Sequence, residues 1–269
     1  MIDGKTRINL VFYVIMYVVF FMKNINKLEL KNKKIIIFDL DGTLIDSIGI
    51  WNMTDQKLIN KYSGMIVDLD TIQTDRNNFL NNNSNTDIYV AYSEYLINKY
   101  NFNITDAYEL TEIRKNLGNE VLKSEIGFKK DVVNLILELK RMGYILVLAT
   151  MTTKSQLEIY YKENKKMLDE MNISEIFDLI TTKETVANKK PAPDIYFEIM
   201  RHFNVSPSEC LIFEDSYTGV LAAFNASIEV VNIYDRYSDI DRDKINDITD
   251  YAIKDYKEFI DNCVKVKKL

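Results

Sequence analysis

IIIFDLDGT, residues 35–43, is the stretch that decides the fold of this chain. Its apolar first half is typical of a buried strand, which ends abruptly at Asp39 and Asp41 and is followed by a Gly-Thr turn. Unpaired carboxylates at a partly desolvated strand end are costly, so the pair is best explained by a divalent cation or a proton transfer that uses both. A lone Asp-x-Asp is more often an acidic strand end in a solvated loop, but three further segments downstream outweigh that interpretation.

The composition indicates a globular protein with one substantial core and an accessory domain, because 47% of the 269 residues are hydrophobic. A net charge of -6, with acids interspersed among the lysines and arginines, argues against a nucleic-acid partner. Cys210 and Cys263 lie far apart and indicate neither a disulfide framework nor a zinc site, so we expect a cytoplasmic protein. His202 is the only histidine, which excludes a His-rich metal site. We expect the protein to act as a monomer.

Residues 1–21 form an apolar N-terminal extension. Residues 10–22 include no polar or charged side chain other than tyrosine, which resembles a signal-peptide core or a short membrane anchor. The run is short for a bilayer span, which needs about 20 residues, and no small-residue cleavage site follows it. Our hypothesis is that Met22 is the physiological start and that the extension is not native, with a signal anchor as the alternative.

Short apolar runs, each followed by a polar or small turn, predict buried parallel strands. They lie at residues 34–38, 145–149, 179–181, 210–213 and 229–233. Apolar residues at helical spacing predict helices between these strands, at residues 131–142, 194–203 and 217–224. The alternation predicts an α/β fold, a doubly wound Rossmann-like parallel sheet with its ligands at the carboxyl ends of the strands.

The interval from residue 52 to residue 126 breaks this alternation. It carries amphipathic helical patterns, one along residues 88–96 and another along residues 110–121, and the asparagine-rich residues 77–83 favour a loop between helices. We interpret the interval as an inserted helical cap domain that lies above the acidic turn and acts as a lid. The catalytic core then comprises residues 22–51 and 127–269.

The strand ends supply one ordered set of polar residues. In chain order they are Asp39 and Asp41, Thr150, Lys190 of the segment KPAPD, and Glu214 and Asp215 of the segment FEDSYTGV. With FDLDGTLIDS, these segments resemble the haloacid dehalogenase-like superfamily of phosphotransferases, from residue 33 to about residue 233. The position of the insertion resembles the helical cap of the subfamily I enzymes of the β-phosphoglucomutase-like branch.

The resemblance implies a role for each acid of the first motif. Asp39 is placed to attack phosphorus as the nucleophile and to form an aspartyl-phosphate intermediate. Asp41 would protonate the leaving oxygen and then deprotonate the incoming water, with its carboxyl pointing away from that of Asp39. In this family the second aspartate also lends its backbone carbonyl to the metal, and members with dehalogenase chemistry lack it. Its presence here therefore favours phosphoryl transfer.

Magnesium is the cofactor that the resemblance implies, held by hard oxygen ligands from Asp39, Asp215 and Glu214. An alternative is that Glu214 only accepts hydrogen bonds while Asp215 contacts the metal. The Thr150 hydroxyl and the next backbone N–H are placed to bind a phosphoryl oxygen, and Lys190 adds a positive charge to the same group and steadies Asp39. Lys189 competes with Lys190, but the Lys-Pro-x-Pro match favours Lys190.

Two residues of the insertion are candidate substrate-binding groups. Trp51 lies at its entry, where it stacks on a sugar or packs the hinge of the lid, and packing is the commoner role. Arg76 is the isolated cation of the asparagine-rich segment, where it binds a second anionic group of the substrate or is solvated.

We predict a magnesium-dependent phosphatase that hydrolyses a small phosphorylated metabolite, specifically a sugar phosphate. The main alternative is a phosphomutase, which uses the same aspartyl-phosphate but returns the phosphoryl group to a second hydroxyl. A non-catalytic binding module of the same fold is the third hypothesis. It is disfavoured because such a module has no physical need for so many converging charges.

Overall fold

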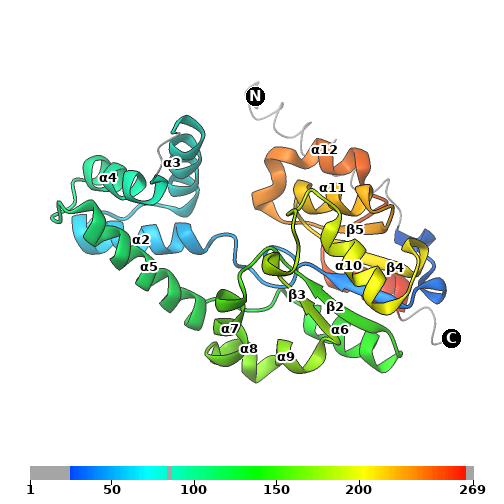
Figure 1. Ribbon diagram of the computed structural model, residues 1–269. Coiled ribbons are helices and arrows are strands. Elements are labelled where there is room, and N and C mark those ends of the chain that lie inside the picture. The colour runs from blue at the N-terminus through cyan, green and yellow to red at the C-terminus, as the bar shows by residue number, and fades with distance from the viewer. Residues whose placement is uncertain (1–24, 84–86, 265–269) are drawn as a thin grey trace, which may run out of the picture.

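The computed structural model describes residues 25–83 and 87–264, and its centre is a six-stranded parallel sheet (Figure 1). The strand order is β3-β2-β1-β4-β5-β6. The strands are β1 (Ile35–Phe38), β2 (Ile145–Ala149), β3 (Leu179–Thr181), β4 (Cys210–Glu214), β5 (Glu229–Ile233) and β6 (Tyr251–Ile253). The α/β fold with a parallel sheet is therefore confirmed, and the sequence missed only the short edge strand β6.

Helices follow the strands in sequence and cover both faces of the sheet. The helices of the insertion are α2 (Ile50–Ser63), α3 (Leu69–Asn82), α4 (Ile88–Tyr100) and α5 (Ala107–Ser124). Those around the sheet are α6 (Val132–Arg141), α7 (Lys154–Lys162), α8 (Lys165–Glu170), α9 (Ile173–Ile176), α10 (Asp194–Phe203), α11 (Tyr217–Asn225), α12 (Arg242–Ile248) and α13 (Tyr256–Phe259). Short 3-10 and π turns connect several of them, at Ile25–Lys27, Leu30–Asn32, Lys183–Thr185, Pro207–Glu209, Arg236–Asp241 and Ile260–Val264.

Alternation along the strands produces two separate cores. Ile36 and Phe38 of β1 face a cluster that includes residues of α6, α7 and α13, whereas Ile35 and Ile37 face a cluster built with α10, α11 and α12. Successive side chains of a strand point to opposite faces, and all four of these are fully buried. A strand that is apolar at every position therefore requires helices on both faces, which is the doubly wound arrangement.

The register of the sheet places the functional segments at one edge. Phe38 of β1 pairs with Leu148 of β2 on one side and with Phe213 of β4 on the other. The residues that follow these positions emerge together at the carboxyl ends of adjacent strands, where open α/β sheets bind their ligands.

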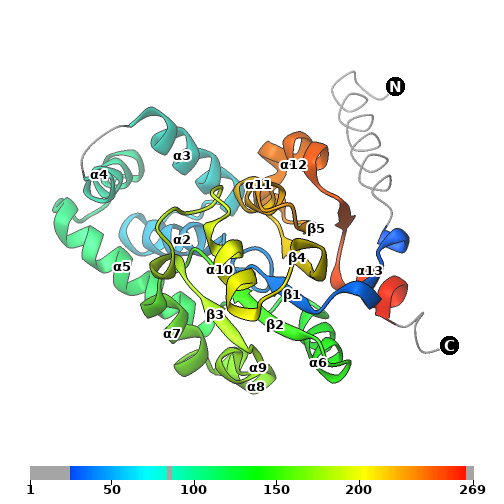
Figure 2. The ribbon, with the colours of Figure 1, turned by 45° about the vertical axis from the view of Figure 1, so that its right-hand side comes forward.

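The helical insertion between β1 and β2 has its own core. Leu58, Ile72, Leu96 and Leu110, one from each of α2 to α5, are buried in a third cluster. Figures 1 and 2 show the four helices grouped together to one side of the sheet. The division into a core and a cap at residues 52 and 126 stays a proposal.

The asparagine-rich segment differs from its prediction. Residues 77–82 belong to α3, and the helix ends only at Asn82. Asp68 caps the helix by accepting a hydrogen bond from the backbone N–H of Thr71, and Ile72 is buried against the other helices of the insertion. The cap and this packing outweigh the weak helix propensity of asparagine, so the loop prediction is wrong.

The apolar N-terminal extension, residues 1–21, lies outside the described residues, and so does Met22. Among the helices that are described, none has the length and apolar character needed to cross a bilayer.

Candidate active site

The turn after β1 presents Asp39 and Asp41 to different surroundings. Gly42 follows with a φ of 82°, a left-handed conformation that glycine adopts readily. A Cβ atom at Gly42 would overlap the carboxylate of Asp215. The close approach of this turn to β4 therefore also requires glycine.

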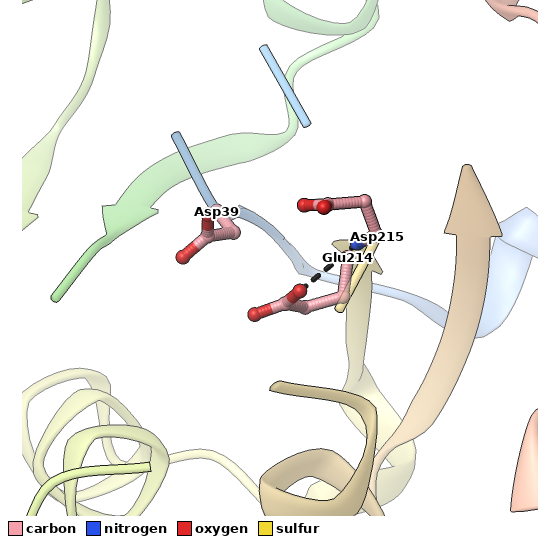
Figure 3. A group of neighbouring side chains, drawn as sticks. All are labelled: Asp39, Glu214 and Asp215. Carbon is pink, nitrogen blue, oxygen red and sulfur yellow. Dashed lines mark hydrogen bonds between the residues drawn. The ribbon is translucent and has the colours of Figure 1, made fainter. Parts of the chain in front are cut away.

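Three carboxylates converge at the ends of β1 and β4. The side chains of Asp39, Glu214 and Asp215 are buried, and each supplies an oxygen within 4.8 Å of the other two (Figure 3). Thr43 Oγ1 donates a hydrogen bond of 2.7 Å to Oδ1 of Asp215 and so connects the turn after β1 to the turn after β4. The structure thus brings together three of the acids predicted as metal ligands.

Lys190 joins this cluster from the segment between β3 and α10. Its Nζ lies 2.7 Å from Oδ1 of Asp39, 2.6 Å from Oε1 of Glu214 and 3.1 Å from the carbonyl oxygen of Ala149. An ammonium group has three protons, so these three acceptors use all of them. Lys190 therefore holds the carboxylates of two strands in fixed positions.

Glu214 is also fixed on its other side. Its Oε2 accepts hydrogen bonds from the backbone N–H groups of Asp215 and Ser216, at 2.9 and 3.1 Å, where α11 begins. Gly219 of α11 packs against the same carboxylate, and a Cβ there would overlap it. Both oxygens of Glu214 thus have protein partners, which favours the alternative in which Glu214 accepts hydrogen bonds while Asp39 and Asp215 face the metal.

Burial of these acids changes their pKa values. Desolvation raises the pKa of Asp39 to about 7, against the opposing effect of Lys190. Desolvation and the neighbouring Glu214 and Asp39 raise the pKa of Asp215 well above its usual range. Burial by itself would lower the pKa of Lys190, but Asp39 and Glu214 raise it well above its ordinary value. The protein alone therefore does not compensate the negative charge of this site.

A divalent cation fits this arrangement of side chains. The three carboxylates are hard oxygen donors of the kind that Mg²⁺ prefers, and the raised pKa values of Asp39 and Asp215 indicate that the site lacks positive charge.

Asp41 is held apart from this cluster by two hydroxyl groups that the sequence analysis missed. Ser47 Oγ donates to Oδ1 of Asp41, and Thr152 Oγ1 donates to Oδ2. Both carboxylate oxygens of Asp41 therefore have hydroxyl partners, and neither is among the acceptors of Lys190. Ser47 belongs to the first motif, FDLDGTLIDS, so its proximity to Asp41 was open to prediction, whereas Thr152 reaches Asp41 only through the pairing of β1 with β2.

Thr150 follows β2 and is almost completely buried. Its hydroxyl accepts a hydrogen bond of 2.9 Å from the backbone N–H of Thr152, and its own N–H donates to the carbonyl of Thr181 at 3.0 Å. The Thr150 hydroxyl thus shapes the turn that presents Thr152 to Asp41.

A cavity of about 320 Å³ lies between this edge of the sheet and the insertion. Its lining combines residues of the core with residues of α2, α3 and α5: Asp41, Ser47, Ile48, Ile50, Trp51, Arg76, Leu122, Thr152, Gln156 and Tyr160. Trp51 and Arg76 both line it, although Arg76 projects from helix α3 and not from the predicted loop.

A family model described as haloacid dehalogenase-like hydrolase matches residues 36–233. The chain belongs to the haloacid dehalogenase-like hydrolases. The match begins within β1 and ends with β5, so it includes every segment that contributes to the site described above. The predicted family resemblance is therefore confirmed.

Relatives of this haloacid dehalogenase-like hydrolase include enzymes and solved structures of similar fold. The phosphoglycolate phosphatase of Colwellia psychrerythraea is 28% identical over 206 residues, which are 77% of this chain and 86% of the relative. The protein CbbY of Rhodobacter capsulatus is 32% identical over 111 residues, 41% of this chain, and the match spans only about half of CbbY, 47% of its length.

The crystal structure of a CbbY variant from Rhodobacter sphaeroides, in complex with xylulose-1,5-bisphosphate, shares the fold with a TM-score of 0.58. That structure is 21% identical to this chain and covers 84% of it and 96% of the CbbY chain. The hydrolase fold with a helical cap is thus common to both.

Proposed function

We propose that this protein is a magnesium-dependent phosphatase that hydrolyses a small phosphorylated metabolite, a sugar phosphate, through an aspartyl-phosphate intermediate. The observation that carries the proposal is the convergence of Asp39, Glu214 and Asp215, the first two of which bind Lys190, at the edge of the sheet that faces the cavity. Asp39 and Asp215, with Glu214 behind them, would hold Mg²⁺, which when bound offsets the repulsion between the carboxylates and the substrate phosphate.

In the first step, Asp39 attacks the phosphorus atom and the bond to the leaving oxygen breaks. Lys190 orients the Asp39 carboxylate, because its ammonium binds Oδ1 at 2.7 Å and is itself held by Glu214. Asp41 donates a proton to the leaving alcohol oxygen. Its carboxyl is presented to the cavity by Ser47 and Thr152, and its separation from Asp39 lets the two acids serve different atoms of the same ester.

In the second step, Asp41 takes a proton from a water molecule, and the resulting oxygen nucleophile attacks the phosphorus of the aspartyl-phosphate. The bond between phosphorus and Asp39 then breaks and inorganic phosphate leaves, so both residues return to their starting states. Splitting one displacement into two gives the same pair of carboxylates a role in each step.

Arg76 supports a substrate with a second anionic group. The residue lines the cavity, is half-buried, and its guanidinium forms no hydrogen bond or ion pair with another described residue. Burial, and the charge of Arg114 nearby, lower the pKa of Arg76, so an anion in the cavity would offset this unfavourable environment. A phosphate ester that carries a second phosphate or a carboxylate has this chemistry.

The proposal is tested with a panel of sugar phosphates and phosphorylated carboxylic acids, with phosphate release measured in the presence and absence of Mg²⁺. We expect magnesium-dependent release, fastest for substrates with two anionic groups. Isomer formation from a hexose 1-phosphate primed with the bisphosphate, without net phosphate release, would instead support the phosphomutase alternative. Absence of both reactions with every compound would reject the enzyme proposal in favour of a binding module.

A further inference from the structure

Trp51, the single tryptophan of the chain, forms part of the cavity wall, and its indole ring is held there by specific contacts. It lies in the first turn of α2, where the chain passes from the core into the insertion, and it lines the cavity together with Asp41. The partly buried indole packs against the apolar core cluster that includes Ile50 and Leu122. A charged side chain of α5 covers it as well, which packing of a hinge alone does not require.

Helix α5 holds the indole from two positions one turn apart. The guanidinium carbon of Arg114 lies 4.5 Å from the centre of the Trp51 ring, and it lies 5.0 Å from the ring of Tyr92. At Gly118, a Cβ atom would stand 3.1 Å from Cζ3 of Trp51. The absence of a side chain at Gly118 therefore lets the indole lie against the helix, while Arg114 covers it.

A buried carboxylate fixes Arg114 in turn. Asp55, on α2 and fully buried, accepts hydrogen bonds from Nε of Arg114 at 2.6 Å and from Nη2 at 3.2 Å. The hydroxyl of Tyr92 donates to Oδ2 of Asp55 at 3.0 Å. The two-point contact sets the plane of the guanidinium as well as its position, which a single contact from a lysine would not do.

We propose that the Asp55–Arg114 pair positions the indole of Trp51 for contact with the substrate, and that Gly118 provides the space in which the ring lies against α5. The inference rests on the proposed function, because it assigns the indole to the non-reacting part of the phosphorylated substrate. A buried ion pair often contributes little to stability relative to apolar packing, so its use here is best explained by the orientation it imposes. Asp55 and Arg114 contact no reacting atom in this proposal, and they act on the substrate through the position of Trp51.

The first test replaces Arg114 by lysine, which keeps the charge opposite Asp55 but removes the planar group over the indole. We expect KM for the best substrate of the panel to rise by up to about tenfold, because the ring loses its fixed orientation and an aromatic contact with the substrate, of roughly 1 kcal/mol, is weakened. The value of kcat should stay within about twofold of wild type, because a contact made equally in the ground state and the transition state affects KM alone.

The second test is Gly118→Ala, which disturbs the indole from the opposite side. The added methyl group displaces the ring, while alanine favours the helix more than glycine does, so Tm should be unchanged or higher. KM should nevertheless rise, by less than in Arg114→Lys. Trp51 is the only tryptophan, so the emission spectrum and its quenching by acrylamide depend directly on the environment and solvent exposure of this ring. Both should change in the two variants.

Ser93→Ala is the matched control. Ser93 is fully buried in α4 and its hydroxyl lies 2.8 Å from that of Thr111 on α5, so the variant weakens the insertion without contacting Trp51. It should lower Tm and leave KM and the tryptophan emission as in wild type.

Wild-type KM and emission in both test variants would overturn the inference, and so would an equal rise of KM in Ser93→Ala. If the wild type hydrolyses no phosphate ester, the proposed function fails and the assignment of the indole to a substrate fails with it. In that case the emission spectra still decide whether Arg114 and Gly118 set the position of the ring.

Discussion

Nζ of Lys190 lies 2.7 Å from Oδ1 of Asp39, although 151 positions separate the two residues in the chain. The same nitrogen lies 2.6 Å from Glu214, so one buried ammonium connects the ends of β1 and β4. The Lys190 side chain is 3% exposed and that of Asp39 is 11% exposed. In a site so poorly hydrated, removing Lys190 leaves two carboxylates without their cation, whereas neutralising Asp39 leaves the ammonium paired with Glu214.

Asp39→Asn should abolish turnover. Asparagine has nearly the same shape but cannot form the acyl phosphate, so we expect phosphate release to fall by at least about 10³-fold. Thermal unfolding without metal should show a Tm equal to or above that of wild type, because one of three crowded carboxylates is gone. Phosphate release at the wild-type rate would show that Asp39 is not the nucleophile.

Lys190→Met should impair both stability and catalysis. Methionine fills a similar volume but leaves Asp39 and Glu214 without their shared cation, which should lower the free energy of unfolding by about 3 kcal/mol. We expect kcat to fall by about 10²-fold or more, because the orientation of the nucleophile is lost. Denaturant unfolding and steady-state kinetics measure the two effects. Lys189→Met, next in sequence and exposed, is the control and should behave as wild type.

The stability of the metal-free protein should decrease as the pH rises from about 4 to about 7. The pKa of Asp39 is raised from 3.8 to about 7 in the folded state, chiefly by desolvation. Its contribution to stability is therefore complete below the unfolded-state value and is lost as the pH passes through the folded-state value. Tm measured with a chelator across this range tests the expectation, and a Tm that rises steadily to pH 7.5 would contradict it.

Magnesium should reverse this loss. A cation that binds only the folded protein stabilises it by mass action, and it binds best when the carboxylates are ionised. We therefore expect the increase in Tm on adding Mg²⁺ to be larger at pH 7.5 than at pH 5. Asp215→Asn should reduce the increase at pH 7.5, whereas Asp194→Asn, at the start of α10 and outside the acidic cluster, should not.

Arg76→Gln should change substrate preference more than it changes the chemistry. For a substrate with two anionic groups, loss of a charge-assisted contact should raise KM by about tenfold or more. For p-nitrophenyl phosphate, which has a single anionic group, KM should stay close to wild type. Lys61→Gln removes an exposed cation of α2 that does not line the cavity, and it should leave both KM values unchanged. An equal effect of Arg76→Gln on the two substrates would argue against a second anion site.

Much of this structure was predictable because the determining patterns are local. The run IIIF specifies a strand that is buried on both faces, and the acids and small residues after each run mark the strand ends. Parallel strands place their carboxyl ends at one edge, so Asp39, Lys190, Glu214 and Asp215 were expected near one another before any contact was known. The strand limits differ from the predictions by one residue at Ile35 and at Glu214.

Other features were decided only by contacts between distant segments. No apolar run of the sequence marked residues 251–253 as a strand, and the edge strand β6 forms there through its pairing with β5. Helix α3 forms across an asparagine-rich segment because its buried face completes the core of the insertion. The hydroxyl of Thr152 reaches Asp41, and Arg114 covers Trp51, across sequence separations over which no local pattern extends.

The sequence by itself determined which chemical groups stand at the strand ends, since strand and turn preferences act over a few neighbouring residues. The tertiary structure decided which partner each group has: a lysine and two backbone amides for Glu214, two hydroxyls for Asp41, and an arginine for Trp51. Charge and hydrogen bonding depend on distances of a few ångströms, and only the folded chain sets those distances.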